Sequence, residues 1–140
     1  FDFTGNYLSQ EEAVIPDAIM CGNDSLAGQA TKALAERRLA GKVIVTGQDA
    51  DLDACQRIVE GTQYMTVYKP VEKLAERAAE IAVALAVNEP INTSDTIHDG
   101  TYDVPYEKLT PVAVTKENID EVIIGSYHQR KEVYLNVREE

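Results

Sequence analysis

The sequence predicts an α/β fold in which helices flank a parallel sheet. Strand-like segments and segments with helical spacing alternate between residues 17 and 90. Short alternation of this kind is the signature of a parallel sheet connected by crossover helices. One strand-like segment, residues 42–47 (KVIVTG), is apolar nearly throughout, as in a strand that is covered on both faces. The chain has no Trp and only 6% aromatic residues, so Ala, Val, Ile and Leu must build its core.

The first strand–helix pair lies between residues 17 and 41. Residues 17–22 (DAIMCG) predict a short buried strand that ends at a glycine. The polar run at residues 23–25 (NDS) offers an N-terminal cap for a helix to about residue 39, and Gly41 follows where helix-ending glycines are common. The predicted buried face of this helix consists of Leu26, Ala30, Ala33 and Leu34.

Two further strand–helix pairs follow, up to residue 90. After the strand 42–47, Asp51 can cap a short helix that Gly61 stops. Residues 63–68 (QYMTVY) predict the third strand, and Pro70 then fits the first turn of a long helix that Asn88 and Pro90 end. The short helix has Leu52, Cys55, Ile58 and Val59 on one side, and the long helix has an apolar stripe of Leu74, Ala78, Ile81, Ala82 and Leu85.

The N-terminal segment, residues 1–16, has no clear place in this pattern. The run at 9–12 (SQEE) is a helix-start signal, but Pro16 interrupts any helix that begins there. The chain begins at Phe1 without a signal-peptide pattern, so we expect a mature or trimmed product.

The segment after residue 90 is polar and rich in turns. Asp99-Gly100 predicts a hairpin turn, and residues 109–115 (LTPVAVT) predict an edge strand because of Pro111. Residues 116–121 predict a helical turn. In the charged tail, a weak strand or a docking segment is expected at Val133, Tyr134, Leu135 and Val137.

The charge balance disfavours two classes of partner. The 24 acidic residues exceed the 13 basic ones, for a net charge of −11. A nucleic-acid-binding protein is expected to carry a basic face, and a protein that binds anionic lipids a polybasic patch. No apolar run approaches the roughly 18 residues that a membrane span needs. We therefore expect no nucleic-acid partner and no direct membrane span.

The sequence predicts no catalytic site, no metal site and no cofactor. It contains no glycine-rich phosphate loop and no recognisable nucleophile–base pair, and His98 and His128 are expected to be surface residues. Cys21 and Cys55 are expected to be buried thiols rather than a disulfide. The spacing of Asp49, Asp51, Asp53 and Glu60 imitates a calcium loop. However, Ala54 stands where that loop needs glycine, and a strand rather than a helix precedes it.

Three polar side chains follow the three predicted strands, at the points where the strands end. Asn23 follows the first strand, Asp49 the second and Lys69 the third. In open α/β sheets, ligands bind at this edge. A carboxylate accepts hydrogen bonds, an ammonium donates them and an amide does both, so the three suit the hydroxyl groups of a neutral sugar. The alternative is that they are three unrelated loop residues.

Three motifs resemble those of type I periplasmic sugar-binding proteins. They are AIMCGNDSLAG at residues 18–28, GQDAD at 47–51 and IVEGTQYMTVYKP at 58–70. Within that family, the last two together are most similar to the D-xylose-binding receptors of ABC transporters. The similarity is close over residues 17–88 and looser to about residue 125.

The resemblance implies one incomplete lobe of a two-lobed receptor that closes on a monosaccharide. Asn23, Asp49 and Lys69 fall where the family hydrogen-bonds sugar hydroxyls. The first lobe, with the remaining ligands, lies upstream of this chain, and the helix that usually precedes the first strand is not recognised in residues 1–15. The implied division is 1–16 unplaced, 17–69 an α/β unit of the C-terminal lobe, 70–90 a helix that returns to the N-terminal lobe, 91–125 hinge and edge strand, and 126–140 a charged tail.

The expected function is that of a fragment of a periplasmic or extracellular receptor for a monosaccharide, D-xylose by resemblance, and not an enzyme. Its downstream partner would be an ABC permease or a membrane sensor kinase, with a lipid anchor carried by a segment outside this chain. The alternative is the sugar-effector domain of a LacI-type transcription regulator. Half of a cleft should bind sugar weakly or not at all. The exposed apolar stripe needs the missing lobe, a companion fragment or a second copy to cover it.

Overall fold

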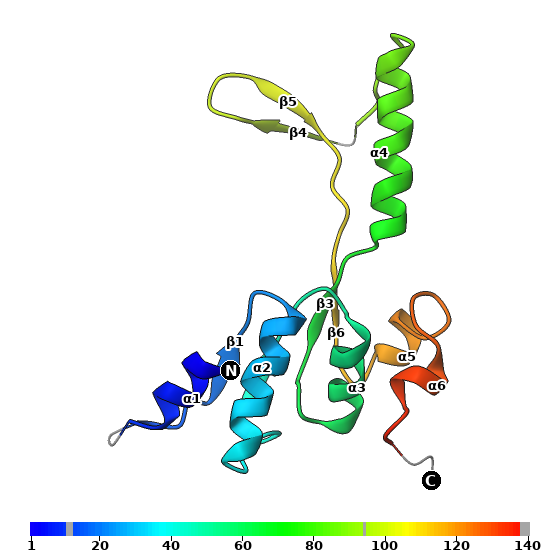
Figure 1. Cartoon of the computed structure of the whole chain (residues 1–140). Helices are drawn as coiled ribbons and strands as arrows, with labels where there is room; N and C mark the ends of the chain where they lie inside the picture. The colour runs from blue at the N-terminus through cyan, green and yellow to red at the C-terminus, as the bar shows by residue number, and fades with distance from the viewer. Residues whose placement is uncertain (11–12, 94, 138–140) are drawn as a thin grey trace. The chain divides into compact units, whose positions relative to one another are not determined.

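The computed structural model describes residues 1–10, 13–93 and 95–137, which form two compact units (Figure 1). The first unit contains Phe1–Tyr68 and Val112–Glu140, and the second contains Lys69–Pro111. Most of the predicted strands and helices lie in the first unit.

The first unit is built on a mostly parallel sheet, which confirms the predicted fold class. Strand β1 (Ala18–Met20) pairs in parallel with β2 (Ile44–Thr46). β2 is joined in parallel to the start of β3 (Thr66–Tyr68), because the Tyr64 amide donates to the Val45 carbonyl at 2.9 Å and Met65 lies opposite Thr46. β6 (Val112–Val114) is antiparallel to β3 and, within the described residues, pairs with β3 alone, as expected for an edge strand.

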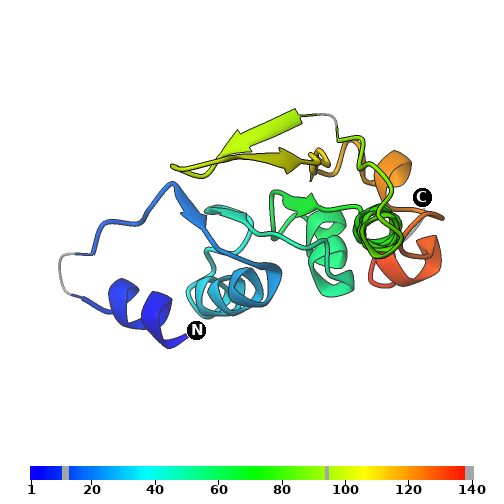
Figure 2. The ribbon, with the colours of Figure 1, turned by 90° about the horizontal axis from the view of Figure 1, so that it is seen from above.

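Two helices lie on one side of this sheet, α2 (Asp24–Glu36) and α3 (Leu52–Glu60) (Figure 2). Gly61 ends α3 in the left-handed conformation, with φ of 84°, as its position predicts. α2 ends three residues before the expected position. The inclusion of Leu26 in its buried face was wrong, because Leu26 is 57% exposed. At about 100° per residue the buried face centres on Ala27, Thr31 and Leu34, and Leu26 lies at its margin.

The prediction that the first strand is buried and the prediction that the second is covered on both faces were also wrong. Val45 is 1% exposed and packs with Ala27 and Leu34, whereas Ile44 and Met20 are 45% and 90% exposed. Ile44 and Met20 share the other face, since side chains alternate along a strand. Within the described ranges, helices cover one face of β1 and β2.

A helix that the sequence did not reveal occupies the N-terminal segment. α1 (Asp2–Leu8) packs against α2, and Arg37 donates from Nη2 to the Gly5 carbonyl at 3.2 Å. The helix was missed because it is one short element with Gly5 inside it and no internal apolar periodicity; its tertiary contacts stabilise it. The start signal at 9–12 lies beyond its end, and residues 11 and 12 of that signal lie outside the described residues.

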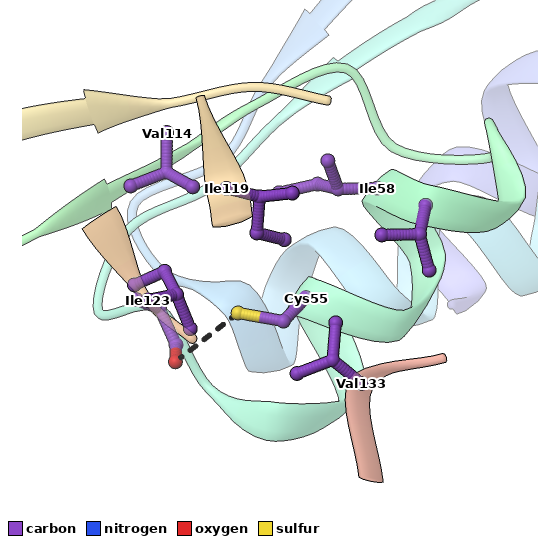
Figure 3. Packing of buried hydrophobic residues seen from close by; sticks show 8 residues of the cluster. Cys55, Ile58, Val114, Ile119, Ile123 and Val133 are labelled. Carbon is purple, nitrogen blue, oxygen red and sulfur yellow. Dashed lines mark hydrogen bonds between the residues drawn. The ribbon is translucent and has the colours of Figure 1, made fainter. Parts of the chain in front are cut away.

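The charged tail docks on the first unit and is not a strand. α5 (Ile119–Val122) and α6 (Arg130–Val133) follow β6, and α6 packs against α3. Figure 3 shows how their apolar side chains meet those of α3 and β6. The tail cluster consists of Ala50, Cys55, Ile58, Val59, Val114, Ile119, Ile123 and Val133. Both cysteines are free thiols, and burial raises the pKa of the Cys55 thiol to about 12.

The second unit consists of a long helix and a hairpin. α4 (Val71–Ala86) has, among the described residues, no buried side chain; Leu74 and Leu85 are 55% and 61% exposed. β4 (Asp95–His98) pairs antiparallel with β5 (Asp103–Tyr106), and Asp99 accepts from the backbone amides of the turn. The predicted turn and the exposure of the stripe are therefore confirmed. No described helix is both long enough and apolar enough to span a membrane.

Candidate functional site

The loops after β1 and β2 and the end of β3 meet at one edge of the sheet (the strand-end edge). The Asp24 amide donates to the Gln48 carbonyl at 2.8 Å and so joins the first two loops. The Asp49 amide donates to the Val67 carbonyl at 2.9 Å and joins the second loop to β3. Asn23 and Asp49, each one residue from the Asp24–Gln48 hydrogen bond, therefore lie at the same edge, as expected from the parallel strands. Their role as ligands stays a prediction.

Asn23 is held in place by the helix that it caps. Its Oδ1 accepts a hydrogen bond from the Leu26 amide at 2.9 Å, the capping interaction that its position predicts. Because this bond fixes the side chain with its oxygen toward the helix, the Nδ2 group is the donor that can face a ligand.

Asp49 lies in an unusual stretch of backbone. Its φ is 108° and that of Ala50 is 57°, both in the region that favours glycine. Such conformations cost about 1–3 kcal/mol each and persist where the surrounding contacts determine them. The Asp49 carboxylate thus sits on a loop whose shape depends on the rest of the unit.

Lys69 directly follows Tyr68, the last residue of β3, and is exposed. It is the first residue of the second unit, where it lines a hollow with Leu74, Tyr106 and Leu109. Its predicted part in the site stays a prediction.

A buried polar network lies beneath the strand-end edge, and sequence reasoning missed it by treating Asp24 only as part of a helix cap. Asp24 is 1% exposed, and its carboxylate accepts hydrogen bonds from Gln63 Nε2 at 3.0 Å and from the Asp51 amide at 3.0 Å. Its two oxygens also lie 2.9 and 2.8 Å from the Thr66 hydroxyl. Arg57 completes the network by donating from Nε to Gln63 Oε1 at 2.9 Å. The sequence feature that could have indicated this network is Thr66, a polar residue within a predicted strand.

Gly47 is required by this network. A Cβ at position 47 would lie 2.1 Å from Asp24 Oδ1, which no side chain can accommodate without displacing the carboxylate. The glycine of the GQDAD motif is therefore explained by close packing against a buried acid.

The C-terminal segment brings aromatic side chains to the same loop. His128 donates from Nε2 to the Ala50 carbonyl at 2.9 Å, because a carbonyl oxygen can only accept. The Tyr127 ring lies 4.4 Å from the His128 ring and 5.1 Å from the Tyr68 ring. The prediction that His128 is a surface residue was wrong, since it is half-buried here; His98 is exposed and pairs with Asp103 at 3.0 Å.

The strand-end edge is acidic. Burial, followed by the charges of Asp24, Asp49 and Asp53, raises the pKa of Asp51. Asp51 is the N-cap residue of α3, as expected from the sequence. Among the described contacts, however, its side chain makes no capping hydrogen bond, so the expected capping interaction was wrong. The described residues hold no group of His, Cys, Asp and Glu arranged to bind a metal ion.

Asp51→Asn is expected to raise the melting temperature at pH 7. A carboxyl whose pKa is raised on folding stabilises the protein below its unfolded pKa, and this contribution is lost as pH rises through the folded pKa. Asparagine removes the unfavourable charge and is equally suited to the N-cap position. Thermal unfolding followed by circular dichroism at pH 7 and pH 3 tests this. A stabilisation that is the same at both pH values would contradict the electrostatic cause.

Comparisons with known proteins match most of the chain. The family described as the periplasmic binding protein domain matches residues 2–90. The D-xylose-binding periplasmic protein of Escherichia coli (strain K12) is 48% identical over 118 residues, which are 84% of this chain and 36% of that protein. The chain therefore spans a little over a third of the length of the curated relatives that it matches.

Solved structures match in the same way. One match is the carbohydrate transporter solute binding protein from Chloroflexus aurantiacus, solved in complex with D-glucose. It has a TM-score of 0.79 and a sequence identity of 31%, and the aligned region is 92% of this chain and 38% of that protein. A second match is an ABC transporter periplasmic solute binding protein from Actinobacillus succinogenes, with bound D-allose. Its TM-score is 0.69 at 25% identity, and the aligned region is 86% of this chain and 37% of that protein. The matches confirm the predicted α/β fold and its partial extent.

Proposed function

This chain belongs to the periplasmic binding protein domain family, and we propose that it forms the C-terminal part of a periplasmic receptor for a monosaccharide. The receptor would deliver its sugar to the permease of an ABC transporter. The curated relative and the two structures described above are named as binding proteins and not as enzymes, and several of the matched structures are named as ABC transporter proteins. These names favour the permease over a sensor kinase, and the receptor over a regulator of the LacI type.

The placement of Asn23 and Asp49 carries the proposal. They follow neighbouring parallel strands whose loops are joined by the hydrogen bond from the Asp24 amide to the Gln48 carbonyl, 2.8 Å long. Asp49 would accept hydrogen bonds from sugar hydroxyls and Asn23 would donate to them. Lys69, which follows the third strand of the same sheet, would donate a charge-assisted bond to a further hydroxyl. Such a set needs no cofactor and binds a neutral ligand.

D-xylose is the proposed sugar. The support is the 48% identity with a protein named for D-xylose, together with the presence of all three proposed ligands in this chain. Structures of similar fold carry D-glucose and D-allose, so the fold alone does not select the sugar. Selection would depend on the side chains that face each hydroxyl.

The test uses a two-lobe chimera, in which the first part of the Escherichia coli D-xylose-binding protein precedes this chain. Isothermal titration calorimetry with D-xylose, D-glucose and D-allose measures its dissociation constants. We expect micromolar or tighter binding of D-xylose, and weaker binding of the two hexoses. Equal affinity for all three would contradict the choice of D-xylose. No binding of any of them would contradict the receptor itself.

Asp49→Ala in the two-lobe chimera is expected to weaken D-xylose binding by about 2 kcal/mol, or about thirtyfold, because a charged acceptor of sugar hydroxyls is lost. Asp53→Ala removes an equal charge from an exposed position in the first turn of α3 and is the matched control. Calorimetry measures both. An unchanged affinity of the Asp49→Ala protein would remove Asp49 from the site.

A further inference from the structure

The carboxylate of Asp24 connects parts of the chain that are far apart in sequence. It accepts from Gln63 Nε2 and the Thr66 hydroxyl, which lie 39 and 42 residues further along the chain, and from the Asp51 amide. Asp24 itself follows β1, Asp51 follows β2, and Thr66 is the first residue of β3. One buried side chain therefore ties the loops after β1 and β2 to strand β3.

Two of the bonds that hold the Asp49 loop depend on this carboxylate. The Asp51 amide donates to Asp24 Oδ2 at 3.0 Å. The Ala50 amide donates to the Thr66 hydroxyl at 3.1 Å, and that hydroxyl is in turn oriented by its own bond to Asp24. Both amides belong to the stretch in which Asp49 and Ala50 have positive φ, so they act where the backbone most needs support.

We propose that Asp24 is the positioning residue of the sugar site: it holds the loop 49–51 in the conformation that presents Asp49 to the ligand. This inference rests on the proposed function and adds to it a residue that does not touch the sugar. Thr66 is the relay, because its hydroxyl accepts from the loop and donates to Asp24. Arg57 and Gln63 keep the carboxylate in place from the opposite side.

The chemistry of the site requires an acid at position 24. The donors reach both carboxylate oxygens, Gln63 at Oδ1 and the Asp51 amide at Oδ2. Asparagine has nearly the same shape, but in either orientation its NH₂ group would face one of these donors. Either the Asp51 amide or the Gln63 amide group would then lose its hydrogen-bond acceptor, and in both cases the network would have to rearrange.

The experiment measures D-xylose affinity by calorimetry in the two-lobe chimera. Asp24→Asn is expected to weaken binding about tenfold or more. Asp53→Asn makes the same charge change at an exposed position and is expected to leave the affinity unchanged. Circular dichroism checks that each variant is folded. A folded Asp24→Asn protein with unchanged affinity would overturn the proposal.

Two substitutions at the relay test the same link with a smaller perturbation. Thr66→Val removes the hydroxyl and nearly conserves the shape, so it is expected to weaken binding, whereas Thr66→Ser keeps the hydroxyl and should retain the affinity. This pair decides the question if Asp24→Asn does not fold. Equal affinities of the Val and Ser variants would overturn the proposal.

A double-mutant cycle separates positioning from a general structural role. If Asp24 acts through Asp49, then Asp24→Asn should weaken binding by no more than about twofold when Asp49→Ala is already present. A further tenfold loss in that background would show that Asp24 acts on something else. The unsubstituted chimera distinguishes the two hypotheses. If it binds no sugar, both the proposed function and this inference are wrong. If it binds sugar, the affinities of the variants test the role of Asp24 separately.

Discussion

The 140 residues alone are expected to bind D-xylose at least about a hundredfold more weakly than the two-lobe chimera. The strand-end edge supplies contacts on one side of the sugar, and the hydroxyls on the other side stay in water. Each net hydrogen bond contributes about 0.5–1.5 kcal/mol, so the loss of several contacts, together with the loss of burial, accounts for this factor. The matched region is only 36% of the length of the D-xylose-binding relative, so we expect the remaining sugar contacts to come from the part of the receptor that this chain does not include.

Calorimetry on the isolated chain and on the chimera in the same buffer measures this difference. Circular dichroism of the isolated chain is the control, because an unfolded chain would also fail to bind. A micromolar dissociation constant for the isolated chain would contradict the prediction and would show that one lobe is a sufficient site.

Ile123→Ala is expected to destabilise the first unit by about 2–5 kcal/mol, the usual cost of removing a large aliphatic side chain from a packed core. Ile123 is 0% exposed and packs in the tail cluster, where α5 and α6 meet α3 (Figure 3). A loss of this size is comparable with the whole stability of a small domain. It would therefore show that the C-terminal segment is part of the fold of this unit.

Leu135→Ala is the matched control, because Leu135 belongs to the same segment but is 70% exposed. Its effect should stay within about 0.5 kcal/mol. Urea unfolding followed by far-ultraviolet circular dichroism measures both variants. Equal effects of the two substitutions would mean that the tail does not dock as described.

The local pattern was sufficient for most elements of the first unit. Asn23 caps α2 and Gly61 ends α3, because capping depends on a few neighbouring residues and on the backbone freedom of glycine. The same holds for the hairpin turn at Asp99-Gly100. The strands are shorter than predicted, three residues each for β1, β2 and β3, since a strand extends only as far as its neighbour pairs with it.

The candidate site was predictable in part. Asn23 and Asp49 could be placed at one edge from the sequence, because the carboxyl ends of parallel strands meet there. The network around Asp24 could not, because its partners Gln63 and Thr66 are 39 and 42 residues away in the chain. The contact of His128 with the Ala50 carbonyl spans 78 residues and was missed for the same reason.

By itself, the sequence determined the parallel α/β sheet, the order of strands and helices between residues 17 and 90, and the family to which the chain belongs. Periodicity, caps and turn residues act within a few positions of the backbone, and the motifs at residues 18–28, 47–51 and 58–70 are contiguous. The tertiary structure alone decided which face of the sheet is covered, that the tail docks, and that Asp24 is buried beneath the loop that carries Asp49. Burial and hydrogen bonding depend on partners from distant segments, and a local pattern carries no information about which of them will meet.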